Sequence, residues 1–167
     1  ESFIKRYNSD LANDFGNLLN RVSGLIGKYF DGCVPAAGTL REEDMVIRDT
    51  ANQLEGKVHT LINQLLVHEA IEQIIQLIRD VNRYVEKQAP WKAAQSDLAA
   101  AGRILYTATD ALRIASILLS PVLPERTQTV LEILGAVGTH PRWGELNPGT
   151  KLQSHEALFP RLEVPAP

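Results

Sequence analysis

The chain has 167 residues, which is enough to bury the core of one domain and too few for two domains to be expected. Its formal net charge of −3 argues mildly against a protein that binds nucleic acid mainly through phosphates, because such proteins usually carry a basic surface. The single cysteine excludes an internal disulfide, and the absence of a long apolar run or a signal-peptide pattern leads us to expect a cytoplasmic protein.

The apolar residues predict helices, since alanine, leucine and isoleucine dominate them and aromatic residues make up only 6% of the chain. Residues 2–31 are predicted to form one long helix, because apolar side chains recur there at steps of three and four. Ser2 can cap the start of this helix and Gly32 can end it. Residues 33–40 contain a proline and a glycine and are predicted to form a loop.

The helical spacing continues through residues 41–87, a length that would be too great for one helix of a compact domain. We therefore predict a break near residues 65–68, where the local signal is weak. A further long helix is predicted over residues 97–119 and a shorter one over residues 125–134. Residues 136–167 are rich in proline and glycine and are predicted to be mostly irregular.

These elements predict an all-α fold, an antiparallel helix bundle of four main helices with a short fifth helix and an irregular C-terminal tail. Residues 1–135 would form the helical-bundle domain and residues 136–167 the tail.

Three polar side chains on the first predicted helix are not needed for bundle packing. Asn13, Asn17 and Arg21 follow one another at intervals of four, so a continuous α-helix places them in one line beside the apolar face. Asparagine is a poor helix former, so two of them in mid-helix carry a cost. The pattern alone favours a solvated flank in which Arg21 pairs with an acid. The alternative is a row of hydrogen-bonding groups that reads the edge of a polar ligand.

Trp91 follows Pro90 at the junction after the third predicted helix. In an up-and-down bundle the first and third helices run parallel, so Trp91 would lie at the same end of the bundle as the later turns of the first helix. A tryptophan at a helix end is usually partly buried packing. The other interpretation is an exposed platform on which a nucleotide base stacks, close enough to share a surface with Arg21.

The sequence contains no recognisable catalytic or metal-binding pattern. His68 and Glu69 resemble the start of a zinc-protease helix, but the second histidine of that motif is absent. The sequence contains neither the Glu-x-x-His pairs of a di-iron bundle nor a glycine-rich phosphate loop. We therefore expect no catalytic residue, no metal site and no cofactor in this chain.

The chain resembles the anticodon-binding domain of bacterial methionyl-tRNA synthetases, which are class I aminoacyl-tRNA synthetases. The resemblance covers nearly the whole chain in family order, and its first two motifs are long and specific. It also supports the helix break predicted near residues 65–68. The segments that carry it are residues 8–21 (NSDLANDFGNLLNR), 82–91 (NRYVEKQAPW), 118–124 (LLSPVLP) and 158–163 (LFPRLE).

The resemblance implies roles for the polar line and the tryptophan. In the family, the positions that match Asn13, Asn17 and Arg21 contact the anticodon, and the position that matches Trp91 stacks on its first base. Pro90 matches the residue that positions this tryptophan. We therefore expect the C of a CAU anticodon to stack on Trp91 while Asn17 and Arg21 read its Watson–Crick edge and Asn13 extends the contact surface.

The resemblance also implies a larger parent enzyme, a methionine–tRNA ligase that uses ATP and Mg²⁺ in protein synthesis, with zinc in the family's zinc-binding insertion. The family's catalytic motifs, similar to His-Ile-Gly-His and Lys-Met-Ser-Lys-Ser, do not occur here, and residue 1 is not methionine. We therefore expect a non-enzymatic part that binds and selects tRNA.

Its expected partners are the anticodon loop of tRNA(Met) and the parent's catalytic domain, with no membrane and no DNA. The tail would pack back on the bundle or toward that catalytic domain. Two alternatives remain open at this point. One is the same domain from another class I synthetase, and the other is a helical protein–protein interaction module with no role in RNA binding.

Overall fold

The computed structural model describes Ser9 and residues 11–153, and within them the fold is all-α, as predicted. The one β pairing in these residues is an isolated antiparallel bridge between Cys33 and Lys151. The predicted cap at Ser2 lies outside the described residues, as does the tail beyond Gln153. The helical elements are the π turn η1 (Leu11–Phe15), α2 (Gly16–Phe30), α3 (Glu42–Asn63), α4 (Val67–Gln88), α5 (Pro90–Ser96), α6 (Leu98–Leu119) and α7 (Pro124–Ile133).

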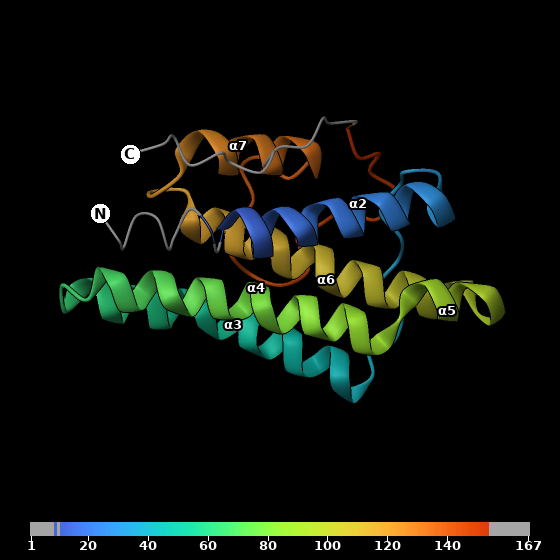
Figure 1. Ribbon diagram of the computed structural model, residues 1–167, viewed down its shortest axis with the longest axis horizontal. Helices are drawn as coiled ribbons and strands as arrows, with labels where there is room; N and C mark the ends of the chain where they lie inside the picture. Colours follow the sequence, from blue (N-terminus) through green and yellow to red (C-terminus); the bar gives the residue numbers. More distant parts are fainter. Residues whose placement is uncertain (1–8, 10, 154–167) are drawn as a thin grey trace.

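The long helices form the predicted antiparallel bundle. Figure 1 shows α2 and α4 running in one direction and α3 and α6 running in the other. The predicted break is confirmed between α3 and α4. It depends on Leu65, which adopts a left-handed conformation at φ 61° without help from a glycine or proline. The structure adds the short helix α5 at the Pro90 junction, and in the first predicted helix it places a π turn directly before α2, which the sequence pattern did not predict.

The core is centred on α6, which contacts α2, α3, α4, α5 and α7. Small residues on α6 let neighbouring helices approach closely, and larger aliphatic side chains from α2 and α4 fill the space around them. The core also holds a buried polar cluster, in which the Asp44 carboxylate of α3 accepts hydrogen bonds from the Tyr84 hydroxyl and from Arg103 Nε, the latter at 2.7 Å. Burial and the Asp44 carboxylate raise the pKa of Tyr84 far above its usual value.

The described part of the tail is irregular and packs on the bundle. Its Leu152 N–H donates to the Gly32 carbonyl at 2.8 Å, and the Val34 N–H donates to the Thr150 carbonyl at 2.8 Å. Ala136, Leu146 and Leu152 join the core cluster. These contacts attach the tail to the loop that follows α2, close to the end of the bundle where α2 and α4 finish (Figure 1).

Candidate functional site

Asn17 and Arg21 lie on α2 and face α4 across a polar groove of about 380 Å³. The helical periodicity of each helix brings polar side chains to this seam, at 17 and 21 on α2 and at 79, 82, 83 and 86 on α4. The full lining is Asp14, Asn17, Arg21, Arg79, Asn82, Arg83 and Glu86.

Arg21 is half-buried at the wall of the groove. Its Nη1 donates a long hydrogen bond of 3.5 Å to the backbone carbonyl of Asn82, the one hydrogen bond of its guanidinium among the described residues. The acid-paired flank that the pattern alone favoured is therefore not observed in this part of the chain. A guanidinium carries five N–H donors, so this single weak contact leaves donor capacity directed at the groove.

Asn13 does not line the groove, because the π turn interrupts the predicted line before Asn17. A π turn closes i→i+5 hydrogen bonds and winds more residues per turn than an α-helix, so the four-residue spacing no longer keeps Asn13 in line with Asn17. Asn13 is exposed, and its Nδ2 donates to the Ser9 hydroxyl at 3.4 Å. Asp14 takes the place in the groove instead and pairs with Arg79 at 3.0 Å.

Pro90 and Trp91 start α5 directly after α4 ends. Ala89 closes α4 in a left-handed conformation at φ 48°, and its N–H donates to the Val85 carbonyl at 2.9 Å. Pro90 is buried in the first turn of α5, where its missing N–H costs no helix hydrogen bond. Trp91 is half-buried: part of it packs against the core and the rest is exposed. Neither residue lines the groove, although α5 contacts α2.

The groove is locally basic although the chain is acidic overall. Three guanidinium groups line it against two carboxylates, and Arg83 is 73% exposed with a weak 3.5 Å contact to Asp80. Sequence reasoning did not single out Asp14, Arg79 or Asn82. The spacing of polar residues on the third predicted helix was the available signal, since it repeats the three- and four-residue steps of a helix face.

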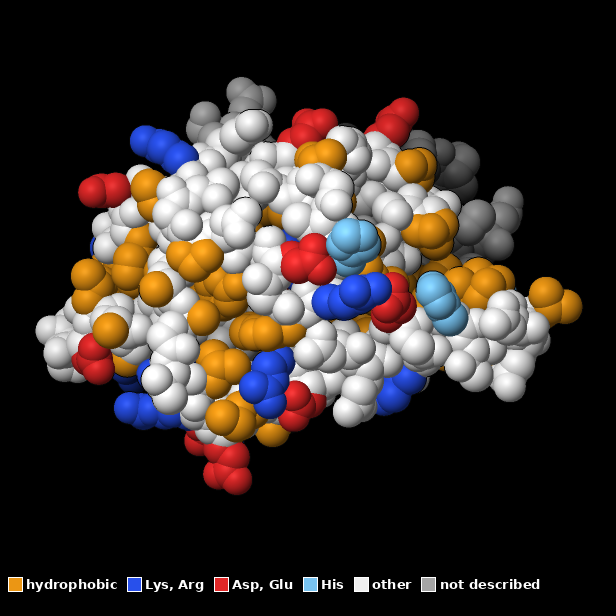
Figure 2. Space-filling view, turned by 180° about the vertical axis from the view of Figure 1, so that it is seen from behind, with side chains coloured by type: hydrophobic (Ala, Val, Ile, Leu, Met, Phe, Trp, Pro, Cys, Tyr) orange, Lys and Arg blue, Asp and Glu red, His pale blue; other side chains and the backbone are white. Residues whose placement is uncertain are grey.

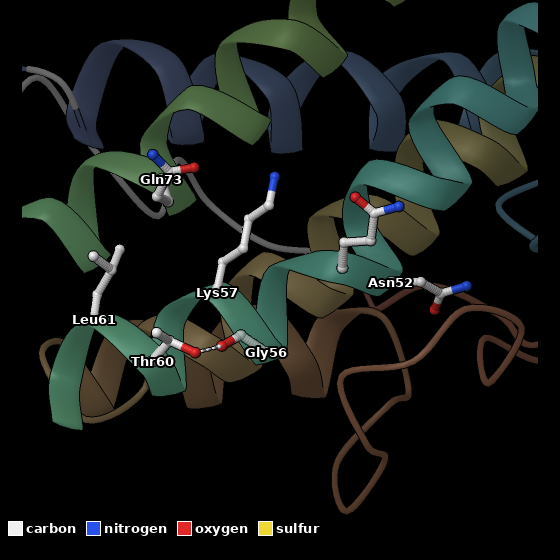
Figure 3. Close-up of a pocket in the computed structure, with 7 residues that line it drawn as sticks. Asn52, Gly56, Lys57, Thr60, Leu61 and Gln73 are labelled. Carbon is white, nitrogen blue, oxygen red and sulfur yellow. Dashed lines mark hydrogen bonds between the residues drawn. The ribbon is translucent and has the colours of Figure 1, made fainter. Parts of the chain in front are cut away.

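A second hollow of about 720 Å³ lies on another side of α4, between α3 and α4 (Figure 3). Figure 3 shows the side chains of Lys57 and Gln73 extending into it, and the Thr60 hydroxyl donating to the Gly56 carbonyl at 2.9 Å. It holds amides, one hydroxyl and one ammonium group but no acid–base pair. Its lining is Asn52, Gln53, Gly56, Lys57, Thr60, Leu61 and Gln73.

Two further hollows are present, one of about 310 Å³ between α3 and α4 and one of about 360 Å³ between α2 and the tail. On the face seen from behind the view of Figure 1, acidic and basic side chains are interspersed with apolar ones (Figure 2). Across Ser9 and residues 11–153 there is no group of three or more histidine, cysteine, aspartate or glutamate side chains placed to hold a metal ion. None of the helices described here is long and apolar enough to cross a membrane.

The chain matches the sequence model of the anticodon-binding domain of methionyl-tRNA ligase over residues 34–164. It is 36% identical to a methionine–tRNA ligase of Streptomyces coelicolor over 98% of this chain and 33% of that protein, and 37% identical to one of Deinococcus radiodurans over 98% and 25%. The free-state crystal structure of Mycobacterium tuberculosis methionyl-tRNA synthetase superposes with a TM-score of 0.86 at 33% identity, over 97% of this chain and 34% of that one.

A second structure of the M. tuberculosis enzyme, bound by methionyl-adenylate, gives a TM-score of 0.84. The chain thus spans about a third or less of the relatives it matches. The matched domain model begins after α2, so Asn17 and Arg21 lie outside it, whereas the relatives align over 98% of the chain.

Proposed function

This chain belongs to the family of anticodon-binding domains of methionyl-tRNA ligases, and on that basis we propose that it binds the anticodon loop of tRNA(Met) and selects the CAU sequence. Ligation of methionine to the tRNA, with ATP and Mg²⁺, would be carried out in the cytoplasm by a longer chain whose catalytic domain is this domain's second partner. The zinc expected from the family would be held in the zinc-binding insertion of that longer chain.

The observation that carries the proposal is that one amide side chain and one guanidinium side chain lie on the same wall of the groove. Asn17 and Arg21 lie one helical turn apart on α2 and share this wall. The Watson–Crick edge of cytosine presents a carbonyl, a ring nitrogen and an amino group. The Arg21 fork can donate to the two acceptors, while the Asn17 amide can accept from the amino group. Single-stranded loops expose such edges because their bases can be splayed out.

Trp91 would hold the same base by stacking. Its indole is partly exposed and is carried on α5, which directly follows α4 and contacts α2. Stacking of a base on an aromatic side chain tolerates any base, so Trp91 supplies affinity while Asn17 and Arg21 supply discrimination. Pro90 would set the ring's position, because it is buried and begins the helix that carries it.

The remaining polar residues have supporting roles in the proposal. Asn13 faces solvent outside the groove, where it would extend the contact to the neighbouring part of the loop. Exposed Arg83 would offer a local positive charge to a phosphate, which reconciles RNA binding with a net charge of −3.

The test compares anticodon stem-loops that carry C or U at the first position, bound to the wild type, Asn17→Ala, Arg21→Gln and the double variant. Paired base contacts are worth roughly 1–3 kcal/mol of discrimination in DNA readout, and the same scale is expected here. Both single variants should lose preference for C, and the double variant should lose less than their sum because neighbouring contacts couple.

Arg48→Gln is the matched control, because Arg48 lies on α3 and pairs with Asp49 on the surface. It should leave the preference for C unchanged. If Arg21→Gln instead weakens both stem-loops equally and flattens the salt dependence, Arg21 contacts a phosphate and the proposed base recognition is wrong.

A further inference from the structure

Asn82 on α4 contacts both the π turn and Arg21. Its side-chain Nδ2 donates to the backbone carbonyl of Asp14 at 2.8 Å, across 68 positions of sequence. Its own backbone carbonyl accepts the hydrogen bond from Arg21 Nη1 at 3.5 Å. The residue is half-buried and lines the groove. A single residue of α4 therefore connects the π turn to the guanidinium two helical turns further along the chain.

The contact with the π turn affects the direction of the groove side chains. A π turn is rare and occurs mostly as a single turn, often at functional sites. The buried side chains of α2 fix its rotation in the core, and η1 joins it directly, since η1 ends at Phe15 and α2 begins at Gly16. A change in the turn therefore reaches first the opening turn of α2, which carries Asn17, and then Arg21 one turn further along.

Among the described residues, two of the contacts between the turn and α4 are the Asp14–Arg79 pair and the Asn82 hydrogen bond, and they differ in strength. The Asp14 carboxylate pairs with Arg79 at 3.0 Å, but both side chains are about a third exposed, so water and salt screen this pair. The Asn82 amide bond is neutral and is not screened in this way. It is therefore a contact that salt leaves in place.

We propose that Asn82 is a positioning residue, which holds η1 against α4 through the Asp14 carbonyl and so directs Asn17 and Arg21 toward the first anticodon base. The inference rests on the proposed function, since it concerns how that base is read. Asn82 acts through Arg21, so the effect of losing its side chain depends on whether Arg21 is present.

The experiment measures binding of the C and U stem-loops by the 167-residue chain and its Asn82→Ala, Arg21→Gln and double variants. Asn82→Ala should reduce the preference for C by about 2- to 12-fold, the range to which the net energy of one hydrogen bond converts. In the Arg21→Gln background the same substitution should have little further effect, because neighbouring residues that act together are not additive.

Asn82→Asp is the second variant, since it keeps the size of the side chain but places a carboxylate against the Asp14 carbonyl. It should match Asn82→Ala. Gln76→Ala is the control: Gln76 is an exposed amide on the same helix that donates to Asp80 at 2.9 Å, outside the groove, and its loss should not change the preference.

The outcomes separate this inference from the proposed function. A wild type that binds both stem-loops equally refutes the proposed function itself. A wild type that prefers C, with both Asn82 variants retaining the full preference, overturns only the positioning role. Equal losses for the two stem-loops, or additive losses in the double variant, also overturn it. If neither Asn82 variant unfolds cooperatively, Asn82 is a residue of the general fold and the positioning role is rejected.

Discussion

Replacing Arg113 with leucine should remove a buried cation that joins α6 to the C-terminal tail. Arg113 Nε donates to Asp110 at 2.6 Å, and both side chains of this pair are fully buried. Arg113 Nη1 donates to the Thr139 hydroxyl at 3.0 Å and the His140 carbonyl at 2.6 Å, and Nη2 donates to the Arg142 carbonyl. Leucine leaves the Asp110 carboxylate buried without its counter-ion.

Removing one partner of a buried ion pair costs about 3–5 kcal/mol, because the other charge remains uncompensated. At about 2–4 °C per kcal/mol for a domain of this size, the melting temperature should fall by roughly 6–20 °C. Burial already raises the pKa of Asp110, and Arg113 opposes that shift, so the variant raises the pKa further. Because the folded-state pKa of Asp110 is raised, the variant loses stability as pH rises from the ordinary aspartate value of about 3.9 to that raised pKa. The free-energy cost of Arg113→Leu should therefore shrink as pH falls back toward about 3.9.

The assay is urea unfolding followed by circular dichroism, at neutral and at mildly acidic pH. Arg48→Leu is the matched control, because Arg48 pairs with Asp49 at 2.9 Å with side chains 33% and 56% exposed. Such surface pairs contribute about 0–1 kcal/mol. If the two variants lose the same free energy of unfolding, or if the Arg113→Leu penalty does not change with pH, the buried-charge argument is refuted.

Three further outcomes are expected. Trp91→Ala should weaken stem-loop binding by about 5- to 150-fold. Trp143→Ala, the control, removes an edge-to-face contact with Tyr106 and should lower stability without changing binding. Equal effects of the two substitutions on binding would contradict this prediction. The purified chain should show no methionine-dependent pyrophosphate exchange, and activity above a mock preparation would disprove its non-catalytic role. Burial raises the pKa of Tyr106 to about 12, so its contribution to stability is full below about pH 10 and is lost as pH rises toward 12. At about pH 11, tyrosinate absorbance should therefore be lower in the folded than in the urea-unfolded chain, and equal absorbance would rule this out.

The long helices were predictable because each buries one face, and burial produces the three- and four-residue spacing that the sequence displays. The π turn was not predictable, because it changes the hydrogen-bonding pattern over only five residues and leaves the composition ordinary. For the same reason Asn13 was expected in line with Asn17. The membership in the methionyl-tRNA ligase family was carried by the two long motifs and is confirmed by the comparisons.

The candidate site was predictable only in part. Periodicity identifies which face of a helix is polar, so it placed Asn17 and Arg21 on one polar flank, and only the family resemblance assigned them to the anticodon. It does not say how two helices are rotated against each other, and that rotation brings Asn82 and Arg79 into the groove. The tail's core residues are spaced irregularly because the segment follows no regular element, so Leu146 could not be distinguished from an exposed leucine.

The bridge between Cys33 and Lys151 also sets an order of events during synthesis. The hairpin of α3 and α4 can pair as soon as both helices leave the ribosome, since three residues connect them. The loop that follows α2 cannot pair with the tail until roughly 120 further residues have been synthesised, which takes about 6–24 s at 5–20 residues per second. Throughout that interval Val34, buried in the finished fold, lacks the tail segment whose Thr150 carbonyl accepts its N–H. The nascent chain therefore completes its groove-bearing helices before it closes the segment beside them.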